Sequence, residues 1–99
     1  MQKITCEEVL EATGGILISG DRNSEFLDVY TDSRRIEKGG LFIPIIGERF
    51  DGHDFIKPSL DAGAEGIITS REIEPVKGKV VIKVYDTLNA LGRIAAFYR

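Results

Sequence analysis

Thr31-Asp32-Ser33-Arg34 and Gly47-Glu48-Arg49-Phe50-Asp51-Gly52-His53-Asp54-Phe55 are two polar runs, each of which directly follows an apolar segment of the sequence. The two apolar segments, residues 26–30 and 41–46, have the composition of buried β-strands. Polar residues that leave neighbouring strands converge at one edge of an α/β sheet, which is where such folds bind ligands. The two runs therefore predict a ligand-binding site at one sheet edge.

Further helices and strands are expected around these segments. Thr5 and Glu8 have the spacing of a capping box, which predicts a helix that ends at Gly14-Gly15. Another helix is expected over residues 54–62, with an irregular first turn because Pro58 falls late for a first-turn proline. Asp86 can cap a last helix, whose expected buried face is Leu88, Leu91, Ala95 and Tyr98. The remaining strands are expected at residues 16–18, 65–70 and 79–84.

This alternation predicts an α/β fold with a small, mostly parallel sheet that is flanked by helices. The segment 41–46 is apolar throughout, as in strands that are buried on both faces. Pro44 argues against a regular strand there, because it has no N–H to donate to the ladder. We keep the strand and expect Pro44 at a bulge or on a side that lacks a partner.

The composition describes one small domain. Its 99 residues are 42% hydrophobic and 29% charged, with a net charge of −3, so the sequence has no basic footprint for nucleic acid. The single cysteine, Cys6, excludes an internal disulfide. No apolar run is long enough for a membrane span, and residues 1–20 lack the pattern of a secretory signal. We expect a cytoplasmic domain without nucleic-acid or membrane partners.

The last predicted helix runs to Arg99 without the glycine, asparagine or proline that usually ends a helix. One explanation is a natural terminus that frays. We favour the other explanation, that the sequence is part of a longer protein. We therefore divide it into a domain over residues 1–84 and a helix over residues 85–99 that leads toward a further domain.

No complete catalytic signature is present in the sequence. The only Gly-Lys pair, Gly78-Lys79, lacks the rest of a phosphate-binding loop. A zinc site is weakly supported, because the sequence has one histidine and one cysteine, far apart. Asp51, His53 and Asp54 could form an acid–base cluster, but a histidine just before a helix is more often a cap or a surface contact. We therefore predict no catalytic residue and no metal ligand.

Binding chemistry has better support. Arg34, Arg35 and Arg49 lie in or beside the polar runs, and a guanidinium forks well onto phosphate oxygens. Ser33 offers a hydroxyl, and Phe50 offers a ring that can stack on a nucleobase. Each residue also has a plain structural explanation, because turns favour serine and aspartate and an exposed arginine is often simply solvated. Both explanations, an anion site and ordinary turns, remain open at this point.

The same residues resemble a known family. Five segments occur in the order seen in the N-terminal, UDP-binding domain of the Mur ligases. They are TDSR, the Gly-Gly-Leu-Phe turn, GERFDGHDFI, the Asp61-Ala62-Gly63-Ala64 helix end and the run from Asp86 to Gly92. The full GERFDGHDF form and Ala12-Thr13-Gly14-Gly15 resemble most the member that adds D-alanyl-D-alanine to UDP-N-acetylmuramoyl-tripeptide (MurF). The member that adds the third peptide residue (MurE) shares the shorter DSR and DGH motifs within the two polar runs. Gly40 and the strand around Pro44 depart from the usual pattern.

The resemblance implies the substrate-binding domain of an ATP-dependent amide ligase in peptidoglycan precursor synthesis. Its parent would use ATP and magnesium through other domains and would act on UDP-N-acetylmuramoyl-tripeptide and D-alanyl-D-alanine; no cofactor is expected in this domain, which would be inactive alone. The alternatives are a MurE-type domain and a free-standing, non-catalytic nucleotide-binding module. The family pattern implies substrate-binding residues (Ser33, Arg34, Glu48, Arg49, Phe50 and His53) and turn-shaping residues (Asp32, Asp51 and Gly52).

Overall fold

Five short strands form the central sheet of the computed structural model, which describes residues 3–99. Their order is β2-β7-β6-β5-β4, and all neighbours run parallel except β2 and β7. A separate antiparallel pair joins β1 (Ile4–Thr5) to β3 (Glu25–Phe26). The prediction of a mostly parallel sheet is confirmed. The five strands are β2 (Ile16–Ser19), β4 (Val29–Tyr30), β5 (Leu41–Phe42), β6 (Gly66–Thr69) and β7 (Val80–Lys83).

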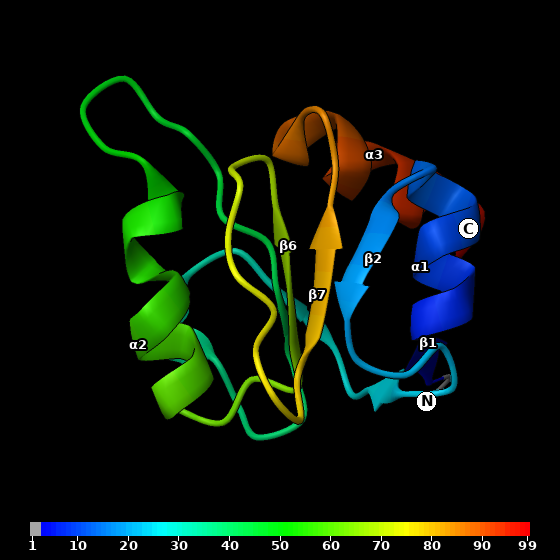
Figure 1. Ribbon diagram of the computed structural model, residues 1–99. Coiled ribbons are helices and arrows are strands. Elements are labelled where there is room, and N and C mark those ends of the chain that lie inside the picture. The colour runs from blue at the N-terminus through cyan, green and yellow to red at the C-terminus, as the bar shows by residue number, and fades with distance from the viewer. Residues whose placement is uncertain (1–2) are drawn as a thin grey trace.

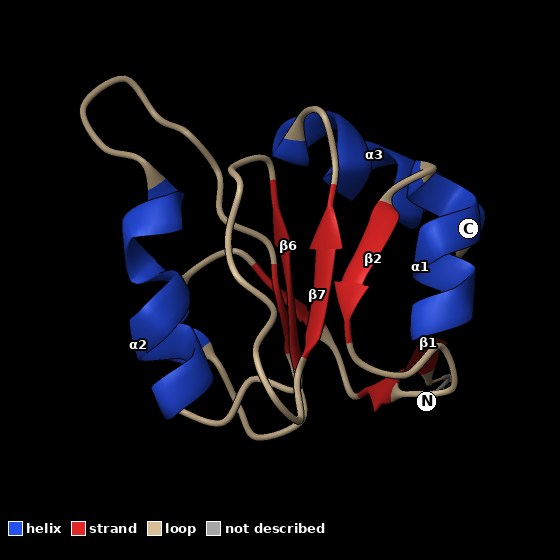
Figure 2. Cartoon of the chain, viewed as in Figure 1, coloured by secondary structure: helices blue, strands red, loops and turns tan. Residues whose placement is uncertain are grey.

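Helices cover both faces of this sheet, as Figure 1 and Figure 2 show. α1 (Cys6–Thr13) and α3 (Thr87–Phe97) pack together on one face, and α2 (Ile56–Asp61) lies on the other. Successive side chains of a strand point to opposite faces. Within β6, Ile68 therefore joins the core beneath α1 and α3, and Ile67 joins the core beneath α2. This layered arrangement confirms the predicted α/β fold class.

α1 and α3 begin at the residues that the sequence predicts. The Thr5 hydroxyl accepts from the Glu8 N–H at 3.2 Å and the Glu8 carboxylate accepts from the Thr5 N–H at 3.2 Å, which completes the capping box. Gly14, with φ of 71°, then ends α1 in the left-handed region. At α3, Asp86 Oδ1 accepts from the Leu88 N–H at 2.9 Å.

The buried face of α3 differs from the predicted one. Leu88 is 63% exposed, and Ala95 is also exposed. Leu91 and Tyr98 pack against the core as expected. An apolar count overlooks small and polar core residues, and for that reason the prediction started the face one residue too late. The buried side chains of α3 are Thr87, Ala90 and Ile94.

The segment 26–30 forms two strands instead of the single strand that its composition predicts. β3 ends at Phe26 and β4 begins at Val29, and these strands belong to different sheets. Between them, the Leu27 N–H donates to the Gly39 carbonyl at 3.0 Å. This bond is made outside either sheet, so the chain bends as it passes from one sheet to the other.

The strand predicted over residues 41–46 ends at Phe42, two residues before Pro44. The Ile43 N–H still donates to the Tyr30 carbonyl at 2.8 Å, but Pro44 has no N–H, so the ladder stops. The helix predicted over residues 54–62 has the irregular start that was expected, because a 3₁₀ turn, η2 (Gly52–Phe55), precedes α2. Among the helices of residues 3–99, none has the length and apolar character needed to cross a membrane.

Candidate functional site

A hollow of about 550 Å³ lies beyond the carboxyl ends of the parallel neighbours β4 and β5. Both polar runs contribute to it, so the structure brings them to one edge of the sheet. Two phenylalanine rings at the hollow, Phe50 and Phe55, are 62% and 43% exposed. Exposed rings at a hollow offer flat apolar surface to a ligand. The lining residues are Thr31, Asp32, Ser33, Arg34, Phe42, Ile45, Phe50, Gly52 and Phe55.

The first polar run forms a 3₁₀ turn, η1 (Ser33–Arg35), which Asp32 holds in place. Asp32 Oδ1 accepts from the Arg34 N–H at 2.9 Å, and the Arg34 guanidinium closes on the same carboxylate at 3.0 and 3.1 Å. The hydrogen bond from the Arg34 side chain is the main cause that lowers the pKa of Asp32. The Arg34 side chain is 87% exposed, so its remaining N–H groups face solvent at the rim of the hollow.

The second polar run begins with a projecting hairpin, residues 46–51, which is the green loop at the upper left of Figure 1. An antiparallel bridge joins Ile46 to Asp51, and the Gly47 N–H donates to the Phe50 carbonyl at 2.8 Å. The Phe50 ring lies over Gly47, where an added Cβ would meet the ring at 2.8 Å. The tip of the hairpin carries two exposed residues that do not line the hollow, Glu48 and Arg49.

The base of the hairpin packs against the segment that leaves β5. The Gly52 N–H donates to the Ile45 carbonyl at 2.9 Å, and a Cβ on Gly52 would lie 2.7 Å from the Ile45 nitrogen. Glycine is needed for this close approach of two backbones. Asp51 then caps η2, because its Oδ1 accepts from the His53 N–H at 2.9 Å.

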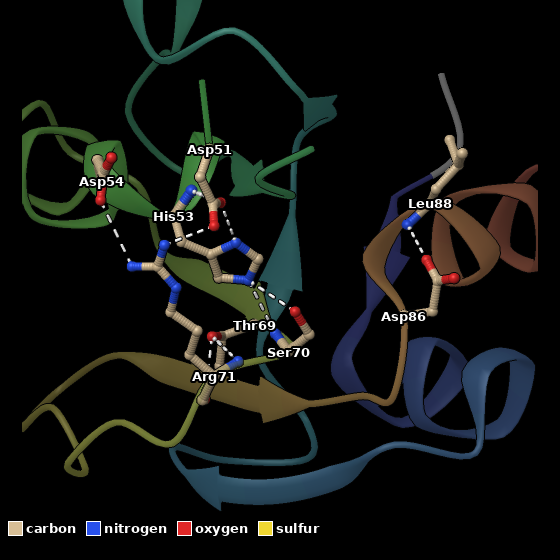
Figure 3. A network of polar contacts seen from close by, with 8 residues as sticks. All are labelled: Asp51, His53, Asp54, Thr69, Ser70, Arg71, Asp86 and Leu88. Carbon is tan, nitrogen blue, oxygen red and sulfur yellow. Dashed lines mark hydrogen bonds and ion pairs between the residues drawn. The ribbon is translucent and has the colours of Figure 1, made fainter. Parts of the chain in front are cut away.

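His53 is enclosed and does not line the hollow. Its side chain has no exposed surface, and Figure 3 shows partners at both ring nitrogens. Nε2 accepts from the Ser70 backbone N–H at 3.0 Å, so the ring proton is on Nδ1, which donates to Asp51 Oδ1 at 2.6 Å. His53 therefore connects the second polar run to the end of β6.

Arg71 makes a second connection to the same end of β6 (Figure 3). Its Nη2 forms a short ion pair with Asp51 Oδ2, and its Nη1 lies 3.4 Å from Asp54 Oδ1. The hydrogen bond from the His53 backbone is the largest cause that lowers the pKa of Asp51 to about 2, and Arg71 contributes as well. Asp51 is therefore ionised at neutral pH, and its carboxylate accepts from the Arg71 guanidinium, the His53 backbone N–H and the His53 ring.

The predicted site residues fall into three places. Ser33, Arg34 and Phe50 line the hollow together with Asp32 and Gly52. Two others, Glu48 and Arg49, lie on the hairpin tip. His53 and Asp51 lie behind the hollow, in the connection to β6.

Sequence reasoning overlooked several residues of this region. Ser70 is the last residue of a predicted parallel strand and Arg71 directly follows it, and that position is the same signal that drew attention to the two polar runs. The apolar residues were seen only as parts of strands or helices, and nothing in their spacing separates a site wall from a core. The overlooked residues are Phe42, Ile45, Phe55, Ser70 and Arg71.

The hollow does not fit a metal ion. Among residues 3–99, no three His, Cys, Asp or Glu side chains are grouped so that they could hold one. Asp32, which lines the hollow, and Asp51, which precedes the lining residue Gly52, are already paired with Arg34 and Arg71. The exposed rings and guanidinium groups are instead suited to an aromatic or anionic ligand.

These features define a small α/β domain with a ligand-sized hollow at the carboxyl edge of its sheet. Residues 26–99 match the family described as "Mur ligase family, catalytic domain". The chain therefore belongs to the Mur ligase family, and it corresponds to the N-terminal domain of these ligases. The resemblance seen in the sequence is confirmed.

Two kinds of ligase occur among the similar sequences. The UDP-N-acetylmuramoyl-tripeptide–D-alanyl-D-alanine ligase of Bacillus subtilis is 37% identical over 99% of this chain, which corresponds to 22% of that protein. The UDP-N-acetylmuramoyl-L-alanyl-D-glutamate–2,6-diaminopimelate ligase of Geobacter sulfurreducens is 34% identical over 93% of this chain and 18% of its own length. The chain thus spans about a fifth of the length of these relatives.

Solved structures of MurF have the same fold. MurF from Acinetobacter baumannii superimposes with a TM-score of 0.86 and 31% identity, over 98% of this chain and 21% of that chain. MurF from Thermotoga maritima, solved in complex with ADP, gives a TM-score of 0.60 and 32% identity, over 69% of this chain and 16% of that chain. At these identities, the likeness supports common descent as well as a common fold.

Proposed function

We propose that this chain binds the uridine-diphosphate end of UDP-N-acetylmuramoyl-tripeptide, within a ligase that adds D-alanyl-D-alanine to it. Residues 1–84 would form the binding domain, and residues 85–99, which include α3, would lead toward an ATP-binding domain. The observation that carries the proposal is the hollow between the two polar runs. It occurs in a chain whose relatives have UDP-N-acetylmuramoyl compounds in their names.

The hollow suits the two halves of uridine diphosphate in different ways. Phe50 and Phe55 expose rings against which the uracil can stack, and such stacking contributes roughly 1–3 kcal/mol per base. At the rim, the Ser33 hydroxyl and the Arg34 guanidinium can donate to phosphate oxygens. We therefore place the base against the rings and the diphosphate at the rim.

The hairpin tip and the enclosed histidine have different proposed roles. Arg49 would contact the diphosphate or shape the uridine pocket, and Glu48 would accept from a hydroxyl of the bound sugar. His53 would act by holding the second polar run in place, because both of its ring nitrogens already have protein partners.

Amide-bond formation needs an activated carboxylate, and ATP with magnesium would supply that activation in the rest of the ligase. The residues of this chain do not fit those groups, since the sequence has no phosphate-binding loop and the hollow has no metal-binding carboxylate cluster. The proposed task of the chain is therefore limited to binding and orienting the nucleotide end of the substrate.

A MurE-type ligase is the second candidate, because the diaminopimelate ligases among the relatives are 32–37% identical to this chain. A free-standing nucleotide-binding module is the third. The sequence that follows residue 99 in the gene separates these candidates. A Gly-Lys-Thr phosphate-binding loop within a few tens of residues supports a ligase, and the later domains distinguish MurF from MurE.

The proposed binding is tested by titrating the isotope-labelled chain with UDP and recording amide shifts by NMR. We expect a dissociation constant on the order of 0.1–10 mM, because only one wall of a shared site is present. The amides of Ser33, Arg34 and residues 48–53 should move. Uridine and inorganic pyrophosphate serve as half-ligand controls and should each move one part of that set. Shifts confined to other regions, or none at about 10 mM UDP, would contradict the proposal.

We also expect the chain alone neither to hydrolyse ATP nor to form an amide bond. The reason is the lack of a phosphate-binding loop in the sequence and of a free base–nucleophile pair at the described hollow. Turnover that scales with the amount of pure chain and disappears in His53→Ala would overturn this expectation.

A further inference from the structure

The 46–51 hairpin projects away from the sheet, as Figure 1 shows. Its internal backbone contacts are the Ile46–Asp51 bridge and the bond from the Gly47 N–H to the Phe50 carbonyl, and the Phe50 ring lies over Gly47. Phe50, which lines the hollow, is held through this loop. Asp51 lies at the base of the hairpin. The position of one wall of the hollow therefore depends on the contacts that fix Asp51.

Arg71 fixes that base from a distant part of the chain. Its two terminal nitrogens reach two different carboxylates, that of Asp51 at the hairpin base and that of Asp54 within η2. Figure 3 shows the guanidinium lying between the two. A planar guanidinium can hold both carboxylates at once, whereas an ammonium group acts as a single point of charge.

Arg71 also sits beside the other connection in this region. Ser70, its neighbour, donates its N–H to His53 Nε2, and the Arg71 N–H donates to the Thr69 hydroxyl at 3.0 Å. The backbone at the end of β6 is thus fixed where the guanidinium leaves it. A fixed backbone at one end and two carboxylates at the other leave the Arg71 side chain little freedom.

We propose that Arg71 is a positioning residue for the nucleotide site: it holds the base of the 46–51 hairpin against β6, so that Phe50 and Gly52 form the wall of the hollow. This inference rests on the proposed function and adds to it a residue that does not line the hollow. Arg71 is 49% exposed and Asp54 is 68% exposed, and such ion pairs contribute little to global stability. Loss of Arg71 should therefore loosen the hairpin without unfolding the domain.

The test compares Arg71→Gln with the unchanged chain in two measurements. The first is UDP titration by NMR, in which we expect the dissociation constant to rise about tenfold, because a loosened wall loses much of its contact with the base. The second is amide hydrogen exchange without ligand. The amides of Gly47 and Gly52, which are bonded to Phe50 and Ile45, should exchange at least about tenfold faster in the variant.

Two further variants sharpen the comparison. Arg71→Lys keeps the charge but cannot span both carboxylates, so its UDP affinity should fall between those of the unchanged chain and Arg71→Gln. Lys83→Gln is the matched control, because Lys83 forms an ion pair of 2.6 Å with Glu72, the residue after Arg71, instead of with the carboxylates at the hairpin base. It should leave UDP affinity and hairpin exchange unchanged.

The outcomes separate the possible roles of Arg71. Weaker UDP binding with faster hairpin exchange, and with unchanged exchange at the Val84 amide that bonds to Thr69, supports positioning. Unchanged UDP affinity, or faster exchange at Val84 to the same degree as at Gly47 and Gly52, overturns it. If the unchanged chain gives no shift with UDP, the proposed function fails. In that case, unaltered hairpin exchange in Arg71→Gln would show separately that Arg71 does not hold the loop.

Discussion

Arginine side chains near the hollow differ in whether a carboxylate already holds them. Arg34 is paired with Asp32, and Arg71 is paired with Asp51 and Asp54. Within residues 3–99, Arg49 makes no hydrogen bond or ion pair and lies exposed on the hairpin tip. A guanidinium without a carboxylate partner needs no exchange of partners to bind phosphate. A substitution of Arg49 should therefore separate an effect on ligand binding from an effect on fold stability most clearly.

We expect Arg49→Ala to weaken the nucleotide and to leave the fold intact. A charged hydrogen bond to phosphate contributes roughly 1.5–3 kcal/mol, so the KM of the nucleotide substrate in the parent ligase should rise about 10- to 100-fold. The free energy of unfolding should change by less than about 0.5 kcal/mol, and the KM for ATP should not change. Arg35→Ala is the matched control, because Arg35 is also highly exposed (83%) but lies within 4.0 Å of the Asp32 carboxylate, whereas Arg49 has no carboxylate partner among residues 3–99. Early melting with an unchanged KM would make Arg49 a structural residue of its turn.

Gly52 and Gly92 should respond in opposite directions to the same substitution. A Cβ on Gly52 would lie 2.7 Å from one backbone nitrogen, so Gly52→Ala should destabilise the fold by about 1–3 kcal/mol. Nothing lies within 4 Å of a Cβ on Gly92, which is inside α3, so Gly92→Ala should stabilise it by roughly 0.5–1 kcal/mol. Urea unfolding of both variants measures the difference. A neutral Gly52→Ala would mean that the backbones can separate at no cost.

At the scale of the elements, the sequence predicted the features that depend on neighbouring residues better than it predicted where strands end. The capping box of Thr5 and Glu8 involves neighbours in the sequence, and the structure contains it as predicted. Pro44 warned of an irregular strand, but only the structure shows that the ladder stops at Phe42. The prediction that the two runs meet at one edge is confirmed, because β4 and β5 are parallel neighbours in the sheet.

The connection through Arg71 illustrates the same limit for the site. Arg71 and Asp51 are 20 residues apart, and nothing in the sequence near either one indicates the pairing. His53 was predicted from a family pattern to touch substrate, whereas its ring is enclosed between Asp51 and Ser70. A pattern indicates that a residue type is present at a site. The packing of two elements decides whether its side chain reaches the hollow or supports it.

The η2 turn should make stability depend on pH through Asp51. Its pKa falls from 3.8 to about 2 in the folded chain, so folding favours the carboxylate form. The stability that this carboxylate contributes is complete above about pH 4 and is lost as the pH falls toward about 2. Asp51→Asn keeps a cap oxygen but has no charge to lose. Urea unfolding at a series of pH values should show the gap between the two proteins narrowing over that range, and a constant gap would contradict this role of Asp51.

At the scale of the whole molecule, the two ends of the described chain are joined on the face opposite α2. The Tyr98 hydroxyl donates to Glu8 Oε1 at 3.0 Å, which connects the end of α3 to the start of α1. The hydrogen bond from the Thr5 side chain, followed by that from Tyr98, lowers the pKa of Glu8. Burial, with the bond to Glu8, raises the pKa of Tyr98 to about 12. This contact shares no residue with the hollow, so stability and binding can be changed separately.

Tyr98→Phe should remove this contact and the pH dependence that it causes. At neutral pH the free energy of unfolding should fall by about 0.5–1.5 kcal/mol, the usual contribution of one hydrogen bond. An unfolded tyrosine loses its proton near pH 10, whereas folded Tyr98 keeps it to about 12, so unfolding releases a proton between these values. The contribution of Tyr98 is therefore complete below about pH 10 and is lost as the pH rises toward 12.

Urea unfolding between about pH 7 and 11 should show the unchanged chain losing its advantage over Tyr98→Phe in the alkaline range. UDP affinity should be the same in both proteins, and a parallel loss of binding would mean that the helix pair and the hollow are coupled.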